Sequence, residues 1–77
     1  MEFEKIRDIT SNILGIDPDR IRPDTIFIDD LGADSLDLYQ IITEIEDEFS
    51  VLVPDEEAER IVTVSDAVNV LKAMKAS

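Results

Sequence analysis

The sequence predicts an all-α fold: a small bundle of three main helices plus one short helix, with a long loop between the first and second helices. Apolar residues recur at three- and four-residue steps in three segments, which is the helical period. Pro and Gly concentrate between the first two segments, and helix-starting residues precede the later ones. A chain of 77 residues has room for one domain, so we interpret residues 1–77 as a single domain.

The first helix is expected over residues 2–14. Its apolar side chains fall on one face at helical spacing, and they are Phe3, Ile6, Ile9 or Thr10, Ile13 and Leu14. Gly15 follows directly, and a glycine at this point typically ends a helix in the left-handed conformation. We expect Ile16 to pack back against the last turn.

Residues 16–34 carry Pro18, Pro23 and Gly32 together with several Asp residues, which is typical of a loop. Asp17 and Pro18 favour a single helical turn within it. A loop of this length in a small domain is usually functional or held by its own apolar residues. The residues expected to hold it to the core are Ile21, Ile26, Phe27, Ile28 and Leu31.

The second helix is expected to begin at Ser35, after Asp34 as its N-cap, and to end at about Phe49 or Ser50. Its core face is expected to comprise Leu38, Ile41, Ile42, Ile45 and Phe49. Leu36 should point away from the core, whereas Ser35 and Tyr39 should lie at the edge of the core face.

The rest of the chain predicts one extended connection and two helices. Residues 51–54 should run extended and bury one or two side chains, and Asp55 should cap a short helix from about Glu56 to Ile61. Thr63 and Asp66 have the spacing of a capping box that starts the last helix. Its inward residues are expected to be Val64, Ala67 or Val68, Leu71 and Met74.

The charge is strongly negative and unevenly placed. The chain has 19 acidic and 7 basic residues, a net charge of −12, and residues 23–59 hold thirteen of the acids and no Lys or Arg. This distribution argues against binding to nucleic acid or to an anionic membrane surface, and it favours a basic protein partner. No segment resembles a signal peptide or a membrane span, so we expect no membrane insertion and a cytoplasmic location. We also expect a monomer.

The composition also disfavours catalysis and specific metal binding. The chain has no Cys and no His, so thiolate chemistry, the usual general base and the commonest metal ligand are missing. An EF-hand loop aligned on Gly32 fails at three ligand positions. We therefore expect no catalytic and no metal-ligating residues, although loose binding of divalent cations by the acid clusters stays open.

The segment with most functional promise is residues 27–37, FIDDLGADSLD. A glycine-containing loop delivers Ser35 to a helix N-terminus among acidic residues. On the residues alone, Ser35 is either simply the residue after an N-cap, which is a very common arrangement, or a hydroxyl positioned for modification by another enzyme. A phosphate ester here would lie at the positive end of the helix dipole.

This segment resembles the attachment motif of the bacterial acyl carrier proteins. The resemblance rests on Asp34-Ser35-Leu36 within residues 30–37, and on residues 46–49 (EDEF) and 54–59 (PDEEAE) at the family's spacing. It extends over essentially the whole chain, including its length, acidity and order of helices.

The resemblance implies a covalent cofactor. Ser35 would carry 4′-phosphopantetheine in a phosphodiester linkage, installed from coenzyme A by a holo-acyl-carrier-protein synthase. Asp34 and Leu36 would help that enzyme to recognise the site. The thiol of the arm, which a chain without Cys cannot supply, would hold acyl groups as thioesters, and the bundle core beside the second helix would shelter the acyl chain.

The resemblance also implies partners, namely ketosynthases, acyltransferases, reductases and dehydratases with basic docking patches. The implied docking residues lie on the second helix and are Asp37, Gln40, Glu44, Asp47 and Glu48. Several positions depart from the family's pattern: Gln40 replaces a frequent acid, Tyr39 a smaller aliphatic residue, Thr43 a Met-like residue, and Glu44 a small residue.

These departures leave the pathway open. The chain would be a carrier for fatty-acid synthesis or a specialised carrier for a polyketide or secondary lipid pathway. A function from another class is an acidic interaction module without a prosthetic group, in which Ser35 stays unmodified.

Overall fold

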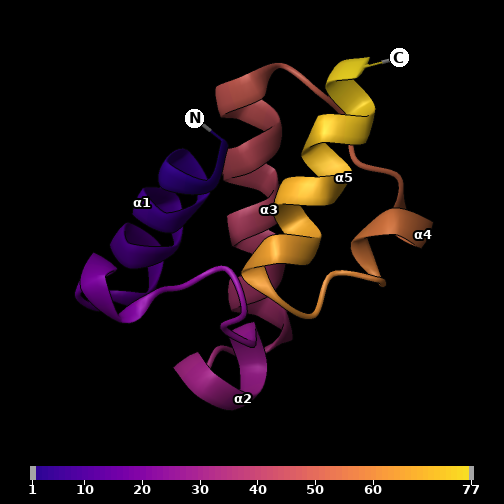
Figure 1. Ribbon diagram of the computed structural model, residues 1–77. Coiled ribbons are helices and arrows are strands. Elements are labelled where there is room, and N and C mark those ends of the chain that lie inside the picture. The colour runs from indigo at the N-terminus through magenta and orange to yellow at the C-terminus, as the bar shows by residue number, and fades with distance from the viewer. Residues whose placement is uncertain (1, 77) are drawn as a thin grey trace.

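A computed structural model describes the backbone of residues 2–76 and the side chains of residues 2–74. Three long helices lie side by side, and shorter helical segments occupy the connections (Figure 1). In chain order the elements are α1 (Glu2–Leu14), the 3₁₀ turn η1 (Pro18–Arg20), α2 (Phe27–Leu31), α3 (Ser35–Phe49), α4 (Asp55–Ala58) and α5 (Val64–Ala76). The predicted all-α class and the three main helices are confirmed.

Helix α1 packs against both α5 and α3. Its Ile6 and Thr10 are completely buried, and Ile9 is half-buried, so Thr10 takes the inner position of the two that the sequence offered. The Thr10 hydroxyl donates a hydrogen bond to the Ile6 carbonyl oxygen at 2.8 Å, which satisfies its polar group inside the core. Gly15 ends the helix at φ 67°, as predicted.

The connection from α1 to α3 contains more regular structure than a loop. The predicted turn at Pro18 is present as η1, but the sequence did not predict α2, whose five residues are too few to show a helical period. Two local interactions define α2: the Asp30 carboxylate accepts a hydrogen bond from the Ile26 N–H at 2.8 Å, and Gly32 ends the helix at φ 69°. The long connection is therefore present with its predicted turn, and α2 is a helical segment that the sequence analysis did not predict.

Helix α2 is anchored by the core and by the segment that precedes α5. The Phe27 ring is completely buried, and the Phe27 N–H donates to the Val62 carbonyl oxygen at 3.1 Å. An isolated antiparallel bridge joins Ile26 to Thr63. Ile21 is buried as expected, but Ile28 is 50% exposed, so its predicted role in holding the loop to the core was wrong.

Helix α3 has the bounds that the sequence predicted. Asp34 caps it, and Asp34 and Asp37 form a reciprocal capping box. At its other end Ser50 adopts the left-handed conformation at φ 55°. Of the predicted core face, Ile41, Ile42 and Ile45 are buried, whereas Leu38 and Phe49 are half-buried.

The connection from α3 to α5 runs extended and then forms the short helix α4. Val51 and Val53 are half-buried, and Leu52 between them is 84% exposed. Helix α4 is shorter than predicted, and Pro54 occupies its N-cap position. The expected capping role of Asp55 was wrong, because Pro54 holds the N-cap position and Asp55 is the first residue of the helix. The capping box of Thr63 and Asp66 is confirmed by two reciprocal hydrogen bonds of 3.0 and 3.1 Å.

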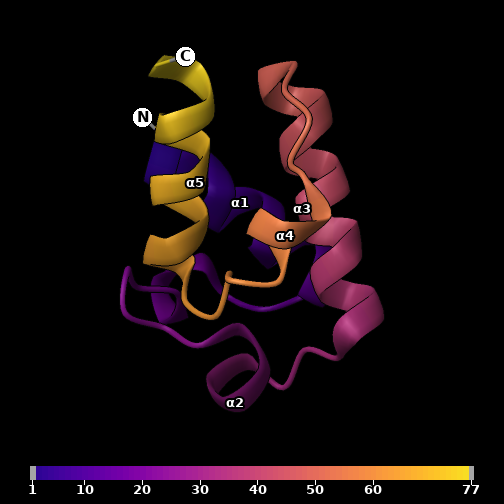
Figure 2. The same ribbon diagram turned by 90° about the vertical axis from the view of Figure 1, so that its right-hand side faces the viewer.

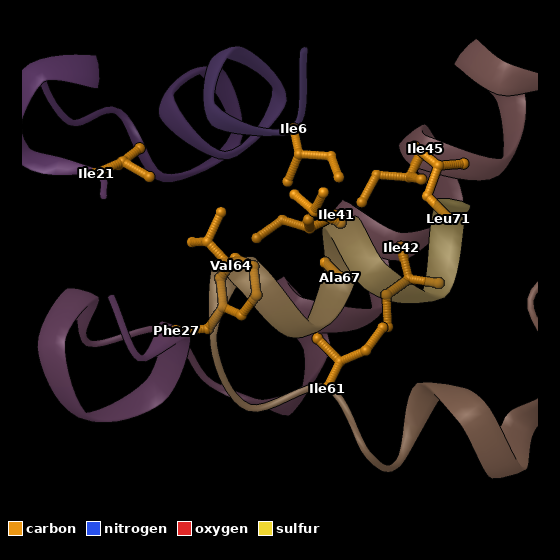
Figure 3. Close-up of a cluster of buried hydrophobic side chains, with 11 residues drawn as sticks. Ile6, Ile21, Phe27, Ile41, Ile42, Ile45, Ile61, Val64, Ala67 and Leu71 are labelled. Carbon is orange, nitrogen blue, oxygen red and sulfur yellow. The ribbon is translucent and has the colours of Figure 1, made fainter. Parts of the chain in front are cut away.

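The hydrophobic core lies between the three long helices and is closed by α2 and α4. Figure 2 shows α4 between α5 and α3, and α2 beneath them. In Figure 3, Ile6, Ile41 and Ile45 extend toward Leu71 and Ala67 of α5, while Ile42 lies beside Ile61. The buried apolar residues are Ile6, Ile21, Phe27, Ile41, Ile42, Ile45, Ile61, Val64, Ala67, Val68 and Leu71.

Candidate functional site

Ser35 lies at the first position of α3, directly after its N-cap. The two carboxylates beside it are occupied by the capping box: Asp34 Oδ1 accepts from the Asp37 N–H at 2.9 Å, and Asp37 Oδ2 accepts from the Asp34 N–H at 3.3 Å. Within the described part of the chain, the Ser35 side chain has no hydrogen-bond partner, and it is exposed. Its hydroxyl is thus available for a reaction.

The backbone in front of Ser35 is fixed rather than loose. Gly32 turns the chain in the left-handed conformation, a backbone state that glycine reaches without steric cost. The next residue, Ala33, is buried, and its N–H donates to the Phe27 carbonyl oxygen at 3.2 Å. Because Phe27 is itself a core residue, the segment that presents Ser35 is tied directly to the bundle.

A cavity of about 280 Å³ opens beside Ser35. Four parts of the chain form its walls. They are Ile26 with α2, the first half of α3, α4, and the segment that follows α4. The lining residues are Ile26, Ile28, Ser35, Leu38, Tyr39, Ile42, Asp55, Ala58, Glu59, Ile61 and Val62. The cavity is therefore mainly apolar, and the hydroxyl groups in its wall belong to Ser35 and Tyr39.

The lining residues differ in depth. Ile42 and Ile61 are 7% and 5% exposed, and their side chains lie beside each other in the core view (Figure 3). Ile28, Tyr39 and Val62 are 50%, 59% and 52% exposed. The buried pair forms the inner end of the cavity, and the exposed three surround its mouth.

The charges near Ser35 have one sign. Asp55 and Glu59 of the α4 segment lie in the cavity wall, and Asp37 follows in the first turn of α3. The N-terminus of a long helix offsets part of the charge of a phosphate ester, because unpaired N–H groups and the helix dipole both point toward it. A free hydroxyl at this terminus can form a phosphodiester, and the apolar cavity beside it can accept an apolar group attached through that ester.

The predicted docking residues of α3 differ in their availability. Gln40, Glu44, Asp47 and Glu48 are all exposed, and so is Leu36 of the attachment motif, at 78%. Asp37, however, is held in the capping box, and Glu48 Oε1 forms an ion pair with Lys5 Nζ at 2.8 Å. The hydrogen bond to Glu48, followed by its negative charge, raises the pKa of Lys5.

The predicted docking residues also lie on different sides of α3. Gln40 and Glu44 line a shallow groove against α1, together with Ile9, Asn12 and Ile13. Ser35 and Tyr39 line the cavity on the α4 side. Tyr39 therefore lines the same cavity as Ser35, whereas Gln40 and Glu44 lie on the side of α3 that faces α1.

Most cavity residues outside α3 were not predicted to contribute to a site. Ile26 and Ile28 were interpreted as core anchors, and Ala58 and Val62 carried no expectation. The sequence offered only a weak signal, namely apolar residues at positions that flank turns. No group of three or more acidic side chains in the described residues could hold a metal ion. Among the same residues, no helix is long and apolar enough to cross a membrane.

Comparisons with known proteins agree with one another. A family model described as a phosphopantetheine attachment site matches residues 4–71. The acyl carrier protein of Clostridium acetobutylicum is 52% identical over 73 residues, which are 95% of each chain. A solved structure from Mycobacterium tuberculosis, described as an acyl carrier protein, superposes with a TM-score of 0.89 at 37% identity over 95% of this chain and 97% of the other. The chain therefore belongs to the acyl carrier protein family, whose cofactor is covalently attached 4′-phosphopantetheine.

Proposed function

We propose that Ser35 is the attachment residue for 4′-phosphopantetheine and that residues 1–77 act as one acyl carrier domain. The observation that carries this proposal is the exposed Ser35 hydroxyl, which has no hydrogen-bond partner among the described residues and lies at the α3 N-terminus beside an apolar cavity. Asp34 and Leu36 flank it, and they are the residues that a modifying enzyme would recognise on either side.

In the attachment step, Ser35 Oγ forms a new P–O bond with the pantetheine-bearing phosphorus of coenzyme A. The pyrophosphate bond breaks, adenosine bisphosphate leaves, and the hydroxyl proton passes to a base of the holo-acyl-carrier-protein synthase. The synthase supplies that base because Asp34 and Asp37 are both engaged with backbone N–H groups. This chain contributes the positioned hydroxyl and a helix N-terminus that offsets the charge of the phosphodiester.

The attached group supplies a thiol that holds acyl chains as thioesters. The apolar cavity next to Ser35 favours a carrier role over a role as an acidic interaction module, because such a module would need no cavity beside an exposed serine. The acids of α3 favour docking to basic surfaces on ketosynthases, acyltransferases, reductases and dehydratases.

We further propose that the protein delivers acyl intermediates to enzymes of fatty-acid synthesis. A specialised carrier for a polyketide or secondary lipid pathway is the second candidate, and Tyr39 in the cavity wall favours it, because the family usually has a smaller aliphatic residue there.

Intact mass spectrometry tests the attachment. The protein is incubated with coenzyme A and a holo-synthase of broad specificity, and a mass gain of one phosphopantetheinyl group is expected. Ser35→Ala should show no gain, whereas the matched variant Ser65→Ala, on the first turn of α5, should be modified like the parent. Modification that persists on Ser35→Ala would overturn the proposal.

A further inference from the structure

Helices α1 and α3 run antiparallel, and their facing residues can be paired turn by turn (Figure 1). Lys5 Nζ meets Glu48 Oε1 at 2.8 Å. One helical turn further along both helices, Ile9 and Glu44 line the same shallow groove. Helix α1 thus supplies a base opposite Glu48 but an apolar side chain opposite Glu44.

This groove combines an apolar surface with polar edges. Ile9 and Ile13 of α1 are half-buried, whereas Asn12, Gln40 and Glu44 are exposed. Among the described residues, none of these three polar side chains has a hydrogen-bond or ion-pair partner. The groove therefore offers a free carboxylate and two amide oxygens beside an aliphatic surface.

The carboxylate of Glu44 has no counterion in the groove. Lys5 is held by Glu48, and Arg7 pairs with Asp8 at 3.1 Å. None of the bases in the described part of the chain lines the groove. The fold thus leaves a single negative charge unmatched between α1 and α3, at a position where the family usually has a small residue.

A guanidinium group on an aliphatic stem matches these features. Its planar set of N–H donors can reach a carboxylate and amide oxygens together, whereas an ammonium is a compact, strongly hydrated charge. The stem can cover apolar surface while the charged end stays in water. If each non-hydrogen atom takes about the 30 Å³ of a water molecule, the 370 Å³ of the groove holds about twelve atoms, more than one arginine side chain needs.

We propose that the groove between α1 and α3 receives an arginine side chain of a protein partner, and that Glu44 recognises its guanidinium group. Asn12 and Gln40 add acceptor oxygens, and the stem lies over Ile9 and Ile13. This inference rests on the proposed docking of basic partners, and it adds α1 to the surface that they contact. It also makes Glu44 a specificity-determining residue, which favours partners with an arginine at this place.

An NMR titration of the isotope-labelled protein with N-acetylarginine amide tests the recognition. The backbone amide resonances of the groove residues should shift in a saturable way. N-acetylcitrulline amide, which has nearly the same shape without the charge, should cause no saturable shift, and N-acetyllysine amide should bind more weakly. Shifts spread over the acidic residues of the whole chain, without preference for the groove, would overturn the proposal.

Four variants, each of which makes the net charge less negative by one unit, assign the binding to the groove. Glu44→Gln should weaken the affinity for N-acetylarginine amide about fivefold, and Asn12→Lys, which places a base beside Glu44, should weaken it at least as much. The controls Asp24→Asn and Glu4→Gln alter exposed residues outside the groove and should leave the affinity nearly unchanged. Equal weakening in all four would indicate general attraction and contradict a specific site.

Binding to a ketosynthase tests the use of the groove by a protein partner. These measurements use the Ser35→Ala background, so the cofactor does not contribute to binding. Asn12→Lys should raise the dissociation constant about fivefold more than Glu4→Gln does. Equal effects of the two variants would show that the partner does not use the groove.

The mass measurement separates this inference from the proposed attachment. If the parent protein gains a phosphopantetheinyl group but N-acetylarginine amide causes no selective shift in the groove, attachment stands and only this inference fails. A selective shift without any mass gain would instead support the groove and contradict attachment.

Discussion

Lys5 Nζ lies 2.8 Å from Glu48 Oε1, and this ion pair links α1 to α3 across 43 residues of sequence. The ion pair also neutralises the charge of Glu48, which is one of the predicted docking residues of α3. With Asp37 held by the capping box, Glu44 and Asp47 are the acids of the predicted docking set that have no partner among the described residues. The structure therefore ranks acids that the sequence had treated as equal.

Charge reversal at Glu44 should slow association with a basic partner. Exposed charges govern the encounter rate more than the lifetime of a complex, so Glu44→Lys or Asp47→Lys should lower the on-rate at low salt and flatten its salt dependence. Conversely, Lys5→Gln should raise the on-rate, because it frees Glu48. Stopped-flow binding to a ketosynthase at two salt concentrations measures both effects. Unchanged on-rates in all three variants would mean that the partner binds elsewhere.

Leu36 should act mainly on dissociation. It is 78% exposed on the outward side of α3, and a desolvated apolar contact at the centre of an interface resists separation. Leu36→Ala should raise the off-rate of the same complex several-fold and leave the on-rate nearly unchanged. Circular dichroism should show unchanged helicity, since Leu36 makes no core contact. A normal off-rate would exclude Leu36 as an anchor.

Added salt should stabilise the free protein. The net charge is −12, and α4 begins with Asp55, Glu56 and Glu57 in succession. The Debye length falls from about 10 Å at 0.1 M to about 3 Å at 1 M, so salt screens this repulsion. The melting temperature should rise with NaCl and with millimolar Mg²⁺. A flat or falling melting temperature would count against net repulsion.

The start of α5 should lose stability in acid. Asp66 Oδ2 accepts hydrogen bonds from the N–H groups of Thr63 and Val62, each at 3.0 Å, and these bonds, with Thr63 first, lower the pKa of Asp66. A carboxylate with a lowered pKa stabilises the fold above the unfolded-state pKa of about 3.9, and this stabilisation is lost as the pH falls through the lower folded-state pKa.

Two substitutions test this role of Asp66. Asp66→Ala should cost about 1 kcal/mol at neutral pH, the usual cost of losing a cap, and should flatten the decrease of stability below about pH 4. Denaturant unfolding at several pH values measures both. Asp24→Asn is the control, because Asp24 is exposed and has no hydrogen bond among the described residues. An equal effect of both substitutions would contradict a specific role for the Asp66 bonds.

Local spacing in the sequence predicts the three long helices, the end of α1, both bounds of α3 and the start of α5. Gly15, Asp34 and the Thr63–Asp66 pair act on backbone groups only a few residues away, so their effect is readable from spacing. The place of Ser35 at the start of α3 follows from the same local rules, and the family resemblance pointed to its use.

The cavity and the pairing of charges depend on tertiary packing, which spacing along the chain does not reveal. Ile28 precedes α3 and Val62 follows α4, and they meet at one mouth only because a bridge joins Ile26 to Thr63. Helix α2 likewise depends on the burial of Phe27, which five residues of sequence cannot reveal. Local hydrogen bonds are encoded within a single turn of helix, whereas cavity walls and the Lys5–Glu48 ion pair exist only once the packing of the core has brought distant segments together.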